Sequence, residues 1–176
     1  PSGYLKVIGA TLIFSFSPTV VKIIQLDAIS MLWTINAVGV GFLVLRLVQK
    51  GRWRELLRPG KAIIVIFVLG LVFTINNALF LSAIKTTTIA NAMFAHYLAP
   101  LFLLFLGSFF LKEKIERVSV VATFISLMGL LVLLSSSELT LSNTHFFGIM
   151  LGTLSAIFFA SEITAKKYLS PYFKPD

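Results

Sequence analysis

Long apolar stretches separated by short polar segments follow one another along the whole chain. Six of these stretches have about the 20 residues that an α-helix needs to cross the hydrocarbon core of a bilayer. Hydropathy and helix-ending residues place the spans at Tyr4–Lys22, Ser30–Val48, Ala62–Ser82, Thr88–Leu111, Val118–Leu134 and Phe146–Ala165. The pattern predicts an all-α integral membrane protein, a bundle of six transmembrane helices.

The composition agrees with this fold class and excludes several kinds of binding site. Of the 176 residues, 57% are hydrophobic and 12% are charged, whereas soluble domains carry about 25% charged residues. The net charge is +8, but the basic residues lie between the apolar stretches, so we do not expect nucleic-acid binding. With no cysteine, two histidines and few acids, the chain predicts no metal site and no cofactor.

The basic residues also predict how the spans are oriented. Of the 15 lysines and arginines, all except Lys22 and Lys85 flank the amino end, the second and fourth connections or the carboxyl end. The positive-inside rule places these segments in the cytoplasm. We therefore expect a multi-pass protein of the cell's inner or plasma membrane, with a cytoplasmic amino terminus.

The sixth span repeats part of the first. At one constant shift, Ile13, Phe14, Ser17 and Lys22 coincide with the identical residues Ile157, Phe158, Ser161 and Lys166. Because an odd number of spans separates the copies, the second copy is inverted, as in many transporters. The pattern predicts one five-helix repeat over residues 1–135 and the first helix of a second, truncated repeat over residues 146–176.

The stretch Phe80–Leu134 carries motifs of a known family. They are a short turn before the fourth span, a proline inside it, an acid at its end and a glycine in the fifth span: Ala83–Lys85 with Thr86–Asn91, Pro100, Glu113 and Gly129. With Lys22 ending the first span, the sequence resembles the EamA domain of the drug/metabolite transporter superfamily. Asn36 stands where the family usually has arginine, so no role of that arginine carries over.

The resemblance implies a ten-helix inverted-repeat carrier of small metabolites, such as amino acids or related solutes, without an ATPase part. Its expected partners are a small-molecule substrate and the lipid bilayer. The remaining helices would come from a second half of the same chain or from a second copy in a homodimer.

Polar side chains within the first four spans lie mostly in the half of the bilayer predicted to be outside. Such residues are costly in lipid and often functional, so we consider as substrate-binding candidates Lys22, Asn76, Asn77, Thr88, Asn91 and His96. Pro18 and Pro100 free backbone carbonyls and predict helix breaks. These residues either line an outward-biased cavity that the fifth span does not line, or form ordinary hydrogen bonds between helices.

Other features of the spans favour structural roles. Glu162 lies one turn before Lys166, which predicts an i, i+4 ion pair, and Glu113 lies in a charged turn. A row of small residues in the sixth span predicts a close-packed helix contact: Gly148, Gly152, Ala156 and Ala160.

Two functional hypotheses from different classes follow. The first is a transporter that moves a small polar metabolite across the cytoplasmic membrane by alternating access. Because Lys22 and Lys85 are the outer cations, we expect its substrate to carry a carboxylate or phosphate. The alternative is a membrane scaffold or assembly subunit that transports nothing. We do not expect an enzyme, since the chain shows no arrangement of nucleophile and base and no phosphate-binding loop.

Overall fold

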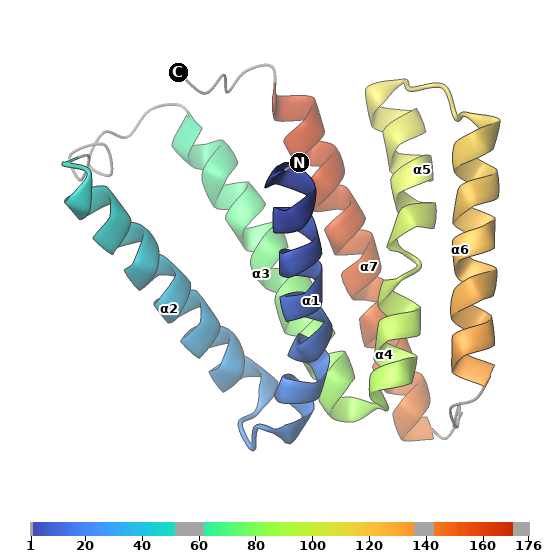
Figure 1. Ribbon diagram of the computed structural model, residues 1–176, viewed down its shortest axis with the longest axis horizontal. Coiled ribbons are helices and arrows are strands. Elements are labelled where there is room, and N and C mark those ends of the chain that lie inside the picture. The colour runs from blue at the N-terminus through green and yellow to red at the C-terminus, as the bar shows by residue number, and fades with distance from the viewer. Residues whose placement is uncertain (1, 52–61, 136–142, 171–176) are drawn as a thin grey trace.

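The computed structural model describes residues 2–51, 62–135 and 143–170, and almost all of them are helical (Figure 1). The helices are α1 (Ser2–Ile23), α2 (Ala28–Gln49), α3 (Ala62–Thr86), α4 (Ile89–His96), α5 (Ala99–Leu111), α6 (Arg117–Ser135) and α7 (Asn143–Leu169). The described chain contains no strand, so the predicted all-α class is confirmed. The basic loop around Arg52, Arg54 and Arg58 lies outside the described residues.

Five segments of the described chain are long and apolar enough to cross a membrane. They are Gly3–Ile23, Ala28–Gln49, Ile64–Thr86, Ile89–Leu111 and His145–Leu169. In α6 the apolar stretch found is the shorter Arg117–Gly129. Five of the six expected spans therefore have membrane length in the structure.

The expected fourth span is divided into two helices. Helix α4 ends at His96, and α5 begins at Ala99 with Pro100 in its first turn. Proline has no N–H and its ring clashes with the carbonyl of the preceding turn, which explains the interruption. Helix α1, in contrast, continues through Pro18 to Ile23, so the break expected there is not seen.

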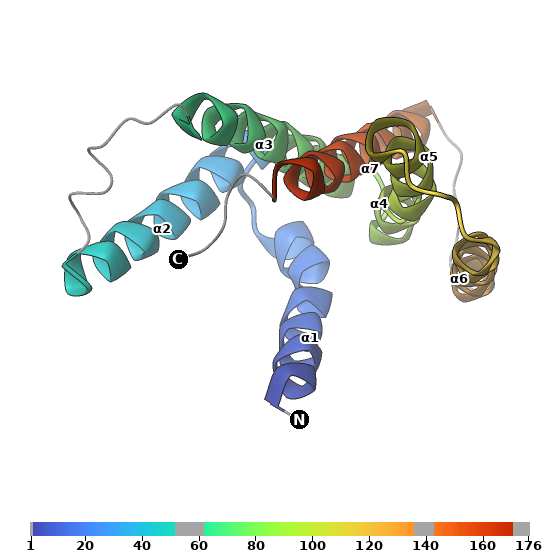
Figure 2. The same cartoon turned by 90° about the horizontal axis from the view of Figure 1, so that it is seen from above.

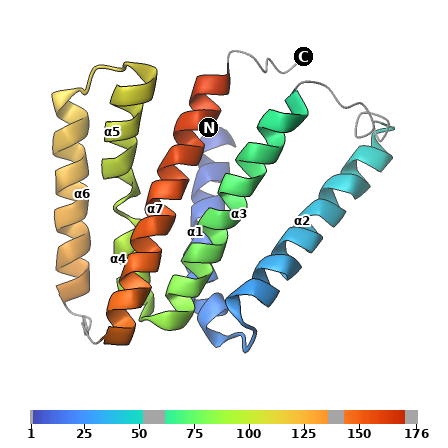
Figure 3. The same ribbon diagram turned by 180° about the vertical axis from the view of Figure 1, so that it is seen from behind.

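Helix α7 occupies the centre of the bundle. It packs against α3 on one side and against α4 and α5 on the other (Figure 3). From above, α2, α3, α7, α5 and α6 follow one another along an open arc, and α1 stands on its inner side (Figure 2). Helix α1 contacts α3 and α4.

Small residues allow α7 to approach its neighbours closely. A Cβ atom at Gly148 would lie 2.5 Å from Cβ of Thr87, and one at Gly152 would lie 2.7 Å from Cβ of Ala95. Ala156 and Ala160, one and two turns further along, are fully buried. The close-packed contact predicted from this row is confirmed.

Asp27 begins α2 and supplies a testable pH dependence. Its Oδ2 accepts hydrogen bonds from the N–H groups of Ile29 and Ser30, both at 3.0 Å. The side-chain hydrogen bond with Ser30 and these backbone bonds lower the pKa of Asp27. A lowered pKa means that the cap stabilises the fold above the ordinary pKa of aspartate and is lost as the pH falls through the folded value.

We expect Asp27→Ala to lower the thermal unfolding midpoint at neutral pH and to remove part of the acid-induced loss of stability. Asp27→Asn is the matched control, because asparagine caps a helix without titrating. Unfolding midpoints of the detergent-purified protein across the acid range test this. A constant difference between Asp27→Ala and the unchanged protein at every pH would contradict it.

Candidate functional site

A buried polar cluster joins the ends of α3, α4 and α7. Thr87, in the turn between α3 and α4, bonds through Oγ1 to Nδ1 of His145 on α7 at 3.0 Å. The same oxygen accepts a 3.0 Å hydrogen bond from Nδ2 of Asn91 on α4. Thr87 and Asn91 are both 1% exposed. The chain therefore places a hydrogen-bonded set of polar groups where three helices meet.

His96 makes a second polar contact between α4 and α7. Its Nδ1 lies 2.8 Å from Oγ of Ser155, and that hydroxyl donates to the carbonyl of Gly152 at 2.7 Å. Because the single hydroxyl proton is used there, His96 donates from Nδ1, and a neutral ring then keeps Nε2 as an acceptor. The imidazole packs against Phe80 and Phe159, with centroid distances of 4.4 and 5.3 Å.

Two lysines join the end of α1 to the end of α3. Lys22 of α1 donates to carbonyls at the end of α3, and Lys85 of α3 donates to a carbonyl at the end of α1. Nζ of Lys22 donates to the carbonyls of Ile84 at 2.7 Å and Thr87 at 2.6 Å, with the carbonyl of Lys85 at 3.5 Å. Nζ of Lys85 in turn donates to the carbonyl of Ile24. The last carbonyls of a helix lack partners within the helix, so each lysine satisfies the end of the other helix and favours its dipole.

The remaining expected site residues lie in different surroundings. Thr88 begins α4 and its Oγ1 accepts from the N–H of Asn91 at 3.1 Å. Asn77 bonds within its own helix, from Nδ2 to the carbonyl of Phe73 at 2.8 Å. Asn76 is buried, and its Oδ1 has no hydrogen-bond partner in the described part of the chain. Asn36, which was not a site candidate and stands where the family usually has arginine, is half-buried on α2.

The structure therefore brings some of the candidates together and leaves others apart. Lys22, Thr88 and Asn91 meet at the α3–α4 turn, and His96 follows at the other end of α4. Asn76 and Asn77 lie further back along α3. In this structure most of these polar groups make hydrogen bonds within or between helices.

Three contributors to this site were missing from the sequence prediction. Thr87 belongs to the turn before the fourth span, His145 lies one residue before the predicted start of its span, and Ser155 is not among the candidates. Ser155 follows Gly152 by three residues and so shares the face of the small-residue row. That spacing was the available signal, because a polar residue on a close-packed face needs a partner on the facing helix.

Acidic side chains lie at the opposite end of the bundle. Glu162 on α7 is 3% exposed and pairs through Oε1 with Lys166, which confirms the predicted i, i+4 pair. Nζ of Lys166 also lies 6.0 Å from the ring centroid of Phe73 on α3. Glu113, which follows α5, pairs with Lys167 of α7 at 2.6 Å. The pair of Glu113 with Lys167 therefore ties α7 to the end of α5, whereas the pair of Glu162 with Lys166 lies within α7.

A cavity of about 650 Å³ also lies at this end, between α5, α6 and α7. Ser119 of α6 is part of its lining. This cavity is at the end opposite to the cluster of predicted site residues. The expectation that the fifth span does not line the outer cavity therefore stays a prediction.

Comparison with known proteins gives the family. The sequence model of the EamA-like transporter family matches residues 1–135. The chain is 30% identical over 82 residues to the uncharacterized transporter YojE of Bacillus subtilis, which covers 46% of this chain and 28% of that protein. It is 34% identical over 106 residues to the uncharacterized transporter YxxF of the same organism. That match covers 57% of this chain and 34% of that protein.

A third relative is Protein RarD of Streptomyces exfoliatus, 27% identical over 113 residues, covering 62% of this chain and 34% of that protein. The matched regions thus span about a third or less of these relatives. No solved structure shows a significant match. The family match over residues 1–135, together with the membrane-length helices, shows that the chain belongs to the EamA-like transporter family and is a multi-pass integral membrane protein.

Proposed function

We propose that this protein carries a small polar metabolite, an amino acid or a related anionic or zwitterionic solute, across the cytoplasmic membrane by alternating access. The observation that carries the proposal is the meeting of two ammonium groups, those of Lys22 and Lys85, where α1 reaches α3. Neither lysine lies within salt-bridge distance of a described carboxylate. Two cations at one place without a carboxylate partner favour a ligand that brings its own negative charge.

Lys22 keeps part of its donor capacity. An ammonium has three N–H donors, and the carbonyls of Ile84 and Thr87 take two of them at 2.7 and 2.6 Å. The carbonyl of Lys85, at 3.5 Å, lies at the limit of a hydrogen bond. We assign the third donor to a carboxylate or phosphate of the solute, and neutral groups from Thr88, Asn91, His96, Asn76 and Asn77 to the rest of it.

The proposed architecture is a ten-helix inverted repeat. Residues 1–135 form the first repeat in this proposal, and residues 146–176 begin the second. Its support is the shared pattern of the first and sixth spans, and the match of the family to residues 1–135. The helices that complete the site come from a second half of the same chain or from a second copy.

The proposed orientation has the amino terminus and the α2–α3 connection in the cytoplasm, because the lysines and arginines gather there. The chain has no native cysteine, so single cysteines report cleanly. In intact cells we expect an impermeant thiol reagent to label Gln25→Cys, in the exposed α1–α2 connection, but not Arg54→Cys. Labelling of position 54 without permeabilisation would reverse the orientation.

Counter-flow uptake into proteoliposomes tests transport itself. With the full-length protein and a panel of amino acids and small carboxylates, a carrier shows saturable accumulation of at least one solute. Lys85→Met should reduce that uptake about tenfold, because a hydrogen bond to a charged group contributes about 1.5–3 kcal/mol. Lys50→Met, at the far end of α2, is the matched control. A membrane scaffold would show no saturable flux with any member of the panel.

A further inference from the structure

The volume and lining of the cavity between α5, α6 and α7 are those of a second binding site, separate from the two outer lysines. Its volume of about 650 Å³ falls within the range of small-molecule sites. Part of its wall is apolar and is formed by Leu103, Leu104, Leu111 and Ile163. Charged side chains of the α5–α6 connection lie at its rim. The lining of the cavity therefore combines apolar and charged side chains.

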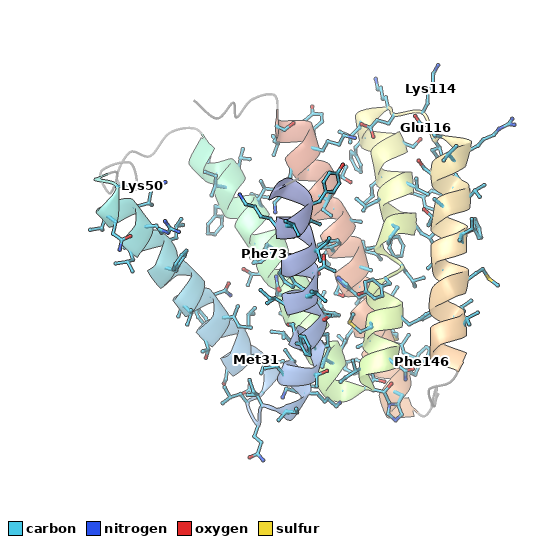
Figure 4. All side chains as sticks on the ribbon, in the orientation of Figure 1. Met31, Lys50, Phe73, Lys114, Glu116 and Phe146 are labelled. Carbon is cyan, nitrogen blue, oxygen red and sulfur yellow. The ribbon has the colours of Figure 1, made fainter. Side chains whose placement is uncertain are left out.

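The rim carries one free charge of each sign. Glu113 and Lys167 neutralise each other at 2.6 Å. Lys114 and Glu116 are exposed, and neither has an ion-pair partner in the described part of the chain. Figure 4 shows both at the end of the bundle where α5 passes into α6. A cation and an anion on the rim of one cavity complement a ligand that itself carries both charges.

Hydroxyl groups line the level below the charges. Ser108, Ser119 and Thr164 come from α5, α6 and α7, one from each helix. Thr164 is 6% exposed, and its Oγ1 has no hydrogen-bond partner in the described residues. Buried hydroxyls are normally paired. Thr164 lines the cavity, so a turn of its side chain toward the cavity lets a ligand supply the missing partner.

An apolar groove continues from the cavity along the outside of the bundle. It has a volume of about 590 Å³ and shares Ser108 and Ile115 with the larger cavity. Its walls include Phe105 and Phe109, which are 69% and 78% exposed. In the site argued here this surface faces hydrocarbon. A ligand with a zwitterionic head and an acyl chain would fill both spaces.

We propose that this cavity and groove bind a phospholipid with an ethanolamine headgroup. Lys114 holds the phosphate, Glu116 accepts hydrogen bonds from the ammonium, and the hydroxyl of Thr164 meets an ester or glycerol oxygen. One acyl chain lies along Phe105 and Phe109. The charged rim lies at the level where α5 ends and α6 begins, which is where headgroups lie beside a transmembrane bundle. The site stands independently of the transported solute.

Thermal unfolding of the delipidated full-length protein tests the site. Phosphatidylethanolamine, phosphatidylcholine and phosphatidylglycerol with identical acyl chains are added to separate samples. The ethanolamine lipid should raise the unfolding midpoint most, because choline has no N–H to donate and glycerol has no positive charge. Lys114→Gln with Glu116→Gln should abolish this advantage, and Lys50→Gln, away from the cavity, should retain it.

A second variant covers the possibility that the double substitution unfolds the protein. Thr164→Val keeps the shape of the side chain but removes its hydroxyl. It should raise the half-saturating concentration of the ethanolamine lipid about tenfold. Equal stabilisation by the ethanolamine and choline lipids, or an unchanged preference in the double variant, would overturn the proposal. If soluble phosphoethanolamine stabilised the protein as strongly as the lipid, the ligand would be a free solute and the lipid assignment would be wrong.

Discussion

A single methyl group at Gly152 is expected to disturb the seating of α7 in the centre of the bundle. The Cβ of Gly152→Ala would lie 2.7 Å from Cβ of Ala95 and 3.2 Å from the carbonyl oxygen of Ala92. Both neighbours are fully buried residues of α4. The obstructing atoms belong to the backbone or sit directly on it, so no flexible side chain can move away. Overpacking of this kind costs about 1–3 kcal/mol.

Gly70→Ala is the matched control for this prediction. Gly70 lies within α3, and a Cβ there would have no neighbour within 4 Å. Alanine is favoured over glycine in a helix by about 1 kcal/mol, so the control should be neutral or stabilising. Thermal unfolding of both variants in the same detergent measures the difference. Equal midpoints for the two variants would show that α7 does not pack against α4 as the structure has it.

Loss of the Lys22 ammonium should affect both stability and transport. Lys22→Met removes the donors to the carbonyls of Ile84 and Thr87 and leaves the end of α3 without its cap. Hydrogen bonds from charged groups contribute about 1.5–3 kcal/mol when buried, and the exposure of Lys22 reduces this to about 1–2 kcal/mol. Lys22→Arg should recover only part of the lost stability and transport, because a planar guanidinium cannot converge on the same carbonyls.

The two roles of Lys22 separate when unfolding midpoints and counter-flow uptake are measured on the same preparations. A solute-binding role requires that uptake by Lys22→Met falls well beyond what its lower midpoint explains. Lys6→Met, at the exposed start of α1, provides the reference for loss of a charge alone. Wild-type uptake in the methionine variant would remove Lys22 from the proposed solute site, and an unchanged midpoint would remove it as a helix cap.

Local sequence determined the helices and several of their ends. Apolar length predicted the spans, and the missing N–H of Pro100 predicted the break between α4 and α5. The i, i+4 spacing of Glu162 and Lys166 predicted their pair, and the row through Gly148 and Gly152 predicted a close contact. All of these depend on neighbours within a turn or two along one helix, where geometry follows from the helical repeat.

The tertiary structure decided which helix faces which, and with it the composition of each site. Lys22 meets the carbonyl of Ile84 from 62 residues away, His96 meets Ser155, and Glu113 meets Lys167. In water an apolar stripe reveals the buried face of a helix. In lipid the outer faces are apolar too, and neighbours are selected by close packing and interhelical hydrogen bonds. The partners of these polar residues therefore became known only when α1 was placed against α3, and α7 against α4 and α5.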